Sequence, residues 1–358
     1  MKASVVRFIA SFTGLMFLAP TTLRADSETL VAQYERQERG TIGWTQSDRA
    51  RLYREWQPKF LAAVDASGNS PVDEAILRNA LVLSTAVADY PSSVRLCDKL
   101  IEQSEVPLDK LRWRRERLEI RERIAIGPGF SVSMGAVQRE AEKLAAELEP
   151  FMNEQRAGVD YFMASQILTN ASMKIHDGAG ILRGSESLLK AHQTPAVRDL
   201  FSTLGAEWRA GVLQNMLRGA LMLEEPASQA AAEKVLGMGL DRRTVWQALQ
   251  GFLPDVSEAR LRRFGDWYFH NAGAEANEFD EAVSYGRLLL CVNDPKAAIA
   301  ILRPLLDQSL PNADCAEGMS VFELVRAKEL VDLTARAYSR LHDRKAEAEV
   351  RSRLPNAP

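Results

Sequence analysis

The sequence of 358 residues has few of the side chains that metal and redox sites require. Only four histidines are present, and no two of them lie three or four residues apart, the spacing that would place both on one helix face. No Cys-x-x-Cys pair occurs, which argues against redox catalysis. We therefore predict no metal site and no cofactor. The histidines are His176, His192, His270 and His342.

Cysteine is almost as rare. Cys97, Cys291 and Cys315 are too few for the disulfide framework of a small secreted domain. Cys291 and Cys315 are expected near the end of one helix and the start of another, where a disulfide could join them. The alternative is three separate buried thiols that behave as small hydrophobic residues. The sequence leaves both arrangements open.

Strand-like runs, long apolar runs and an excess of basic residues are also missing. Alternating runs of Val, Ile and Thr, which are typical of strands, do not occur, so a β fold is not expected. No apolar run after residue 25 approaches the roughly 20 residues that span a bilayer. The 48 acidic residues outnumber the 45 basic ones. This balance gives no general attraction for nucleic acid.

The first 25 residues have the features of a signal peptide. Lys2 and Arg7 are basic, residues 8–20 form a short apolar run, and Leu23 and Ala25 occupy the positions that a signal peptidase reads. We expect cleavage after Ala25 and export of the mature chain to the periplasm or the exterior. Because the apolar run is short, a retained membrane anchor is not expected.

Residues 26–358 are predicted to be helical almost throughout. Segments of roughly 12 to 20 residues have apolar positions spaced by three and four and are rich in Ala, Leu, Glu and Arg. Clusters of Gly, Pro, Asn and Asp separate them at regular intervals and predict about a dozen helices joined by short loops. The pattern indicates an all-α fold of stacked helical pairs that form an α-α superhelix. The cluster at 126–135 is a predicted internal boundary.

The most highly charged segment, residues 110–123, reads KLRWRRERLEIRER. On a helix, Leu111 and Leu118 would lie on one side, and Trp113 and Ile120 nearly on the opposite side. We therefore expect a helix that is packed on two faces, with its charges on the flanks. This arrangement is favoured over a basic surface that recognises nucleic acid.

Residues 282–311 and 333–355 combine small residues with large apolar ones at helical spacing, and in this they resemble tetratricopeptide repeats, which are pairs of antiparallel helices. Residues 282–311 carry the small and large residues of this pattern, and residues 333–355 carry a second, less complete match with Ala335 and Tyr338. The resemblance implies that 282–358 is the most repeat-like region, and that the chain binds a protein or a peptide. The matching residues of the first segment are Ala282, Tyr285, Gly286, Leu289, Ala298, Leu302 and Leu305.

Three short motifs, at residues 183–187, 211–214 and 270–273, resemble those of soluble lytic transglycosylases, which cleave peptidoglycan. They contain Glu186, Gln214 and Asn271. The resemblance implies that a protonated Glu186 in an apolar cleft would be the general acid. Without catalysis, we expect Glu186 in the first turn of a helix that spans 185–192 and is capped by Ser185.

An aromatic segment at 263–269 suggests either a binding groove or a core between helices. Arg263, Trp267 and Tyr268 are its candidate binding residues, because aromatic and arginine side chains are enriched in peptide and glycan grooves. The same aromatic density is typical of a tight core. We predict an exported binding module or scaffold, and the alternative is a glycan-cleaving enzyme.

Overall fold

The computed structural model describes residues 25–40, 45–68, 70–126, 132–152, 158–200, 205–253, 255–271, 278–310 and 319–354. Within these ranges every regular element is a helix, seventeen of them α-helices, and no strand is found. The prediction of an all-α fold is confirmed. The helices are more numerous than the dozen expected, because short breaks such as those at Ser104 and Gln193 are marked only by a single following proline, Pro107 or Pro195.

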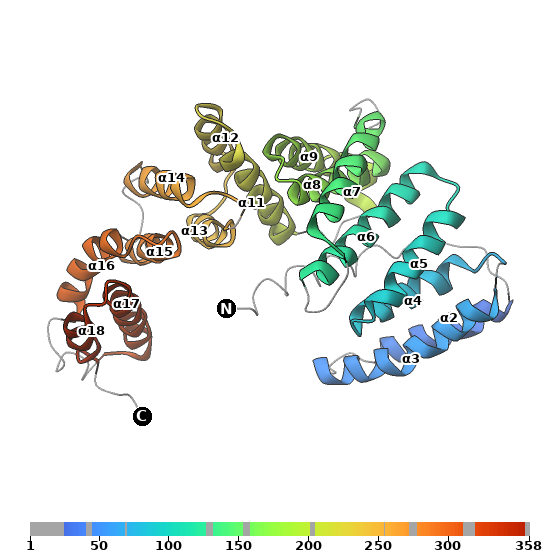
Figure 1. Ribbon diagram of the computed structural model, residues 1–358, viewed down its shortest axis with the longest axis horizontal. Helices are drawn as coiled ribbons and strands as arrows, with labels where there is room; N and C mark the ends of the chain where they lie inside the picture. The colour runs from blue at the N-terminus through green and yellow to red at the C-terminus, as the bar shows by residue number, and fades with distance from the viewer. Residues whose placement is uncertain are drawn as a thin grey trace. The chain divides into compact units, whose positions relative to one another are not determined.

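The chain divides into two compact units, one ending at Met134 and the other beginning at Gly135. In the first unit each helix contacts the next along the chain, from blue to cyan in Figure 1. Its helices are α2 (Ala25–Arg39), α3 (Gln46–Ala66), α4 (Glu74–Ala86), α5 (Tyr90–Gln103) and α6 (Pro107–Ile126).

Helix α6 is the charged segment, and it is buried on two faces as predicted. Trp113 and Ile120 belong to the core of the first unit, and Leu111 and Leu118 on the other side are buried as well. Arg115 is also buried, and its guanidinium contacts two carboxylates of its own helix. The apolar side chains of this segment and Arg115 therefore pack against neighbouring residues, and the segment does not form an exposed basic surface.

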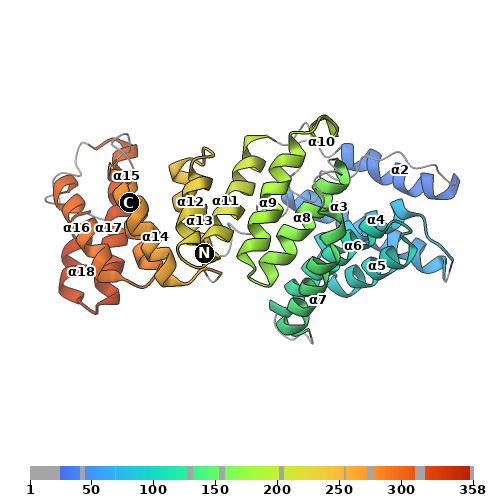
Figure 2. The same ribbon diagram turned by 90° about the horizontal axis from the view of Figure 1, so that it is seen from above.

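The second unit begins with α7 (Met134–Glu147), whose first residue lies at the division between the units. Most later helices contact the next one along the chain, and the views in Figures 1 and 2 agree on this. They are the 3-10 helix η1 (Glu149–Phe151), α8 (Val159–Lys174), α9 (Gly178–His192), α10 (Pro195–Leu200), α11 (Ala206–Met222), α12 (Ala227–Leu236), α13 (Arg242–Gly251), α14 (Glu258–Asn271), α15 (Glu278–Cys291), α16 (Pro295–Ser309), α17 (Val321–Arg340) and α18 (Arg344–Arg351).

One turn joins two antiparallel helices at four places. In each case an aliphatic residue is followed by a residue with φ between 55° and 64° and then by an aspartate. The aspartate N–H donates to the carbonyl oxygen five residues earlier, at 2.8–3.1 Å, and its carboxylate caps the next helix. One side chain therefore begins the second helix at the point where its backbone closes the first. The turns are Val87-Ala88-Asp89, Ile175-His176-Asp177, Val292-Asn293-Asp294 and Leu341-His342-Asp343.

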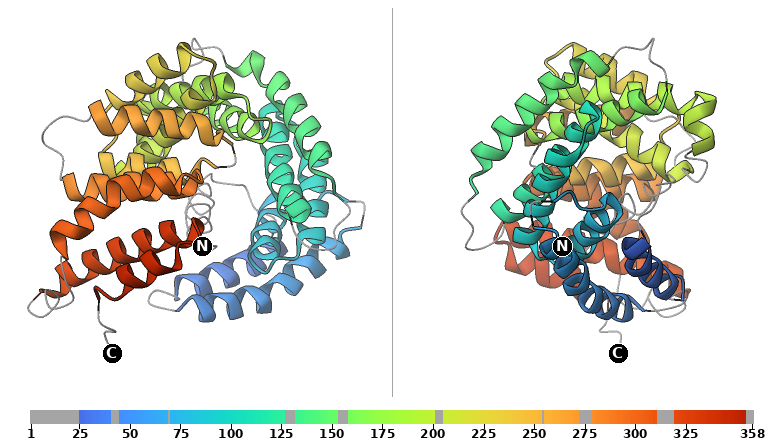
Figure 3. Two further views of the ribbon diagram at one scale, coloured as in Figure 1. Left: turned by 60° about the vertical axis from the view of Figure 1, so that its left-hand side comes forward. Right: turned by 90° about the vertical axis from the view of Figure 1, so that its right-hand side faces the viewer.

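A second regularity concerns which helices touch. In the second unit α11 contacts α13, α13 contacts α15, and α15 contacts α17, so alternate helices form a continuous row. The helices between them pack against members of the row: α14 contacts α15, and α16 contacts both α15 and α17. Figure 3 shows the last of these helices, coloured from orange to red, lying one above another.

Helix α9 begins earlier than predicted. We expected a helix over 185–192 with Glu186 in its first turn, but α9 starts at Gly178 and is capped by Asp177. The glycines within it allow close packing: a Cβ at Gly184 would lie 2.9 Å from the backbone nitrogen of Thr169 on α8. Ser185 is therefore not a cap but a fully buried residue in the middle of the helix.

Among the described residues, no helix combines the length and apolar character that crossing a bilayer requires.

Candidate binding surface

The aromatic segment of α14 packs mainly as a core. Tyr268 is buried, with its ring centroid 5.3 Å from that of Trp246 on α13 and 5.8 Å from that of Phe264. Burial raises the pKa of Tyr268 to about 12, although the nearby positive charge of Arg242 opposes this shift. The phenol is therefore neutral over the physiological range and has the environment of a structural residue.

A buried carboxylate beside these aromatic residues accepts hydrogen bonds from side chains of a neighbouring helix. Glu281 on α15 accepts hydrogen bonds from Arg242 Nε, at 2.7 Å, and from the indole N–H of Trp246. Of the three predicted binding residues in α14, only Arg263 and the half-buried Trp267 reach the surface. Arg263 faces Glu225 at 3.6 Å. The described contacts fit a core joining α13, α14 and α15 better than a groove.

The residues of the alternative enzymatic interpretation lie on three helices. Glu186 is on α9, Gln214 on α11 and Asn271 at the end of α14. The Glu186 side chain is 35% exposed and its carboxylate forms a 2.7 Å ion pair with Lys234. The Asn271 amide donates to the carbonyl oxygen of Trp267 in its own helix. A general acid would instead need a protonated carboxyl in an apolar cleft, and Glu186 occupies a different environment.

Neither the cysteines nor the histidines form a reactive cluster in the described part of the chain. No group of three or more His, Cys, Asp or Glu side chains there could hold a metal ion. Cys97 is buried and Cys291 is half-buried, and burial raises the pKa of both thiols. The predicted partner of Cys291, Cys315, lies outside the described residues.

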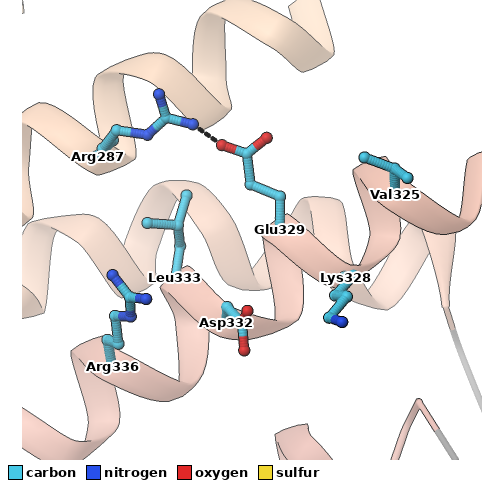
Figure 4. Close-up of a pocket in the computed structure, with 7 residues that line it drawn as sticks. All are labelled: Arg287, Val325, Lys328, Glu329, Asp332, Leu333 and Arg336. Carbon is cyan, nitrogen blue, oxygen red and sulfur yellow. Dashed lines mark ion pairs between the residues drawn. The ribbon is translucent and has the colours of Figure 1, made fainter. Parts of the chain in front are cut away.

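A groove lies between α15 and α17, with a volume of about 340 Å³. Figure 4 shows Arg287 of α15 facing Glu329 of α17 across it, and the two form an ion pair. Leu333 is buried, whereas Val325 is 60% exposed. The groove is lined by Arg287, Val325, Lys328, Glu329, Asp332, Leu333 and Arg336.

An apolar patch continues from this groove toward the start of α17. Val321 is 82% exposed and Phe322 is 68% exposed, which is unusual for such large apolar residues. At about 100° per residue, both fall on the same side of α17 as Val325 and opposite the buried stripe of Ala327, Leu330 and Thr334. We use the name α17 surface for Val321, Phe322, Val325, Lys328, Asp332 and Arg336.

The charges of the α17 surface are only partly neutralised. Asp332 lies 3.7 Å from Arg351, and both side chains are about half exposed. Lys328 and Arg336 are exposed and form no ion pair with any described residue. The pKa of Arg287 is lowered chiefly by burial and also by the positive charge of Arg336, whereas Cys291 opposes this shift. The groove therefore has excess positive charge near Arg336.

Reasoning from the sequence missed this surface. Val321 and Val325 lie four residues apart, and Phe322 adjoins Val321, a spacing that fits one wide apolar stripe of a helix. A second apolar stripe runs along the opposite face, so α17 has two apolar faces at its start, as α6 does. This signal was available. What it could not indicate is that one of the two faces would be exposed.

No protein-family model matches the chain, and no curated protein shows significant similarity to it.

Proposed function

We propose that this chain is an exported helical-repeat protein that binds a protein or peptide partner and has no catalytic role. The α17 surface carries this proposal, since it combines a groove, exposed apolar side chains and two cations that pair with no carboxylate among the described residues. These are the components of a peptide-binding surface. The apolar part is small, which favours a peptide-binding module over a scaffold held by a broad apolar patch.

We also propose that the helical pairs of the second unit are divergent repeats of the tetratricopeptide type, stacked as a superhelix. Support comes from α15 and α16, which form the hairpin that the resemblance at 282–311 implies. A Cβ at Gly286 would lie 2.5 Å from Leu302, so a small residue is needed where these helices meet. The recurring aspartate turn and the row of alternate helices add to this support.

Capture from the native envelope tests the binding function. A photo-reactive amino acid replaces Val325 in the groove and, as a control, Leu341 at the end of α17, which is 38% exposed. After irradiation, the tagged mature protein is purified from its own envelope fraction and cross-linked partners are identified by mass spectrometry. We expect a specific adduct from position 325 only. Equal labelling from both positions, or no adduct from either, would contradict the proposal.

Export is tested separately by sequencing the N-terminus of the mature protein. We expect the chain to begin at Asp26, after removal of the predicted signal peptide. An intact N-terminus on protein recovered from outside the cytoplasm would exclude cleavage at this position.

A further inference from the structure

Three charged residues of the α17 surface form a regular row. Lys328, Asp332 and Arg336 are four residues apart and alternate in sign. Residues at i and i+4 are neighbours on a helix surface, separated by about 6 Å along the axis. Val325 lies three residues before Lys328 and adds an apolar position at one end of the row. The order along α17 is therefore apolar, positive, negative, positive.

The spacing of this row matches that of an extended peptide. In a strand, every second side chain points to the same face, at intervals of about 6.6 Å. The interval between the charged positions of α17 is about 6 Å, and the difference of less than about 1 Å per step is within the reach of the long Lys and Arg side chains. The step from Val325 to Lys328 is shorter, about 4.5 Å, so the apolar contact is the least closely matched of the four. A strand lying along α17 could thus place one side chain opposite each member of the row.

From this match we propose that the α17 surface binds an extended peptide segment of a partner protein whose alternate residues are apolar, acidic, basic and acidic. This inference rests on the proposed binding function and specifies its ligand. The acidic residues face Lys328 and Arg336, the basic residue faces Asp332, and the apolar residue packs against Val325. The segment reads in this order when it runs parallel to α17, and in reverse order when it runs antiparallel.

The charge pattern favours a peptide over an anionic surface. Lys328 and Arg336 are exposed and have no carboxylate partner among the described residues, so a ligand carboxylate can reach both. Asp332 lies between them and would repel phosphate groups of a membrane or a nucleic acid. Its contact with Arg351, at 3.7 Å between half-exposed side chains, leaves room for a second cation. A mixed-charge ligand satisfies all three positions.

Synthetic peptides test the register directly. Two labelled ten-residue peptides carry Leu, Glu, Lys and Glu at alternate positions, one in each order, with Ser and Thr between them. The control peptide has the same composition, but its charges are consecutive, so that they point to both faces of a strand. Binding to the mature protein is followed by fluorescence anisotropy up to about 1 mM peptide, at low salt because exposed charges are screened. We expect at least one alternating peptide to bind about tenfold more tightly than the control.

Charge reversal on the protein provides the second arm. The double variant Lys328→Glu with Arg336→Glu should bind the alternating peptide at least tenfold more weakly. The matched control, Arg344→Glu with Lys345→Glu on the exposed start of α18, should bind it like the wild type. Adding Asp332→Lys to the first pair inverts the row. This triple variant should prefer a peptide with Lys, Glu and Lys at the charged positions, a gain that misfolding cannot produce.

Several results would overturn the inference: no binding of either alternating peptide, equal binding of the control peptide, or no change on charge reversal. Binding to vesicles of anionic phospholipid that depends on Lys328 and Arg336 would also overturn it and assign the surface to a membrane. These failures can be separated from failure of the binding function. If cross-linking at Val325 captures a partner that the double variant still binds, the function stands and only the ligand assignment is wrong.

Discussion

Replacing Gly184 with alanine tests the close contact between α8 and α9. The new Cβ would lie 2.4 Å from Thr169 Oγ1, 2.9 Å from Thr169 N and 3.0 Å from the Ser165 carbonyl oxygen. Two of these atoms belong to the backbone and cannot rotate away, so the helices must separate. Overpacking of this kind costs about 1 to 3 kcal/mol. The Thr169 hydroxyl, which donates to that carbonyl oxygen at 2.9 Å, would also be displaced.

The opposing contribution is the higher helix propensity of alanine, which is worth about 1 kcal/mol. Loss of the hydroxyl hydrogen bond adds roughly 0.5 to 1.5 kcal/mol to the cost. Together these terms predict that Gly184→Ala destabilises the second unit by about 0.5 to 3.5 kcal/mol. Gly251→Ala is the matched control, because this glycine ends α13 and an added Cβ would meet nothing within 4 Å. It should be neutral or stabilising by up to about 1 kcal/mol.

Urea unfolding followed by circular dichroism at 222 nm measures both variants. Since the chain has two compact units, the transitions are fitted without assuming a single two-state step. Changes in the free energy of unfolding that agree within about 0.5 kcal/mol for the two variants would refute the packing argument. The glycines of α9 would then need another explanation.

Three further predictions concern other parts of the chain. Trp113→Ala should destabilise the first unit by roughly 2 to 5 kcal/mol in the same assay, because the ring is buried in the core of this unit. A loss of stability under about 0.5 kcal/mol would favour the alternative interpretation, in which α6 is an exposed basic helix. Glu186→Gln should cost at most about 1 kcal/mol of stability, since it removes one partly exposed ion pair. Neither the wild type nor this variant should release muropeptides from purified sacculi. Release by the wild type that the substitution abolishes would establish the enzymatic function. Hydrogen bonds from Arg303 lower the pKa of Glu349 below its unfolded value, so this contact stabilises the fold above about pH 4, and the stabilisation is lost as the pH falls through the folded-state pKa. Arg303→Gln should therefore reduce the loss of unfolding free energy at acid pH by at most about 1 kcal/mol. An unchanged dependence on pH would contradict this prediction.

The helical content and many of the helix boundaries could be predicted from the sequence because they depend on local chemistry. Asp89 and Asp294 sit in turn clusters that the sequence marks, and each caps the helix that follows. The two packed faces of α6 were likewise predictable, since apolar residues on opposite sides of one helix are expected to be buried on both sides. Such signals act within one or two turns and need no knowledge of the partner helix.

The start of α9 and the α17 surface could not be predicted in this way. Read locally, Gly178 and Gly184 mark a break, yet Gly178 lies against α11 and Gly184 lies against α8, where there is no room for a side chain. From the sequence, the core interpretation of Tyr268 was favoured over a groove but not established, and contacts from α13 and α15 decide that it is a core residue. Whether Phe322 is covered depends on which helices pack beside it, and no local pattern contains that information.

The recurring aspartate turn also bears on how the protein reaches its folded state. Its closing hydrogen bond spans five residues, so the entropy cost of forming each hairpin is small and does not depend on the rest of the chain. We propose export for this protein, and an exported chain that crosses a membrane unfolded emerges from its N-terminus onward. Each hairpin can close as soon as its second helix has emerged, and the next pair then adds to a surface that already exists. Maturation outside the cytoplasm would therefore proceed pair by pair, without waiting for the final helix.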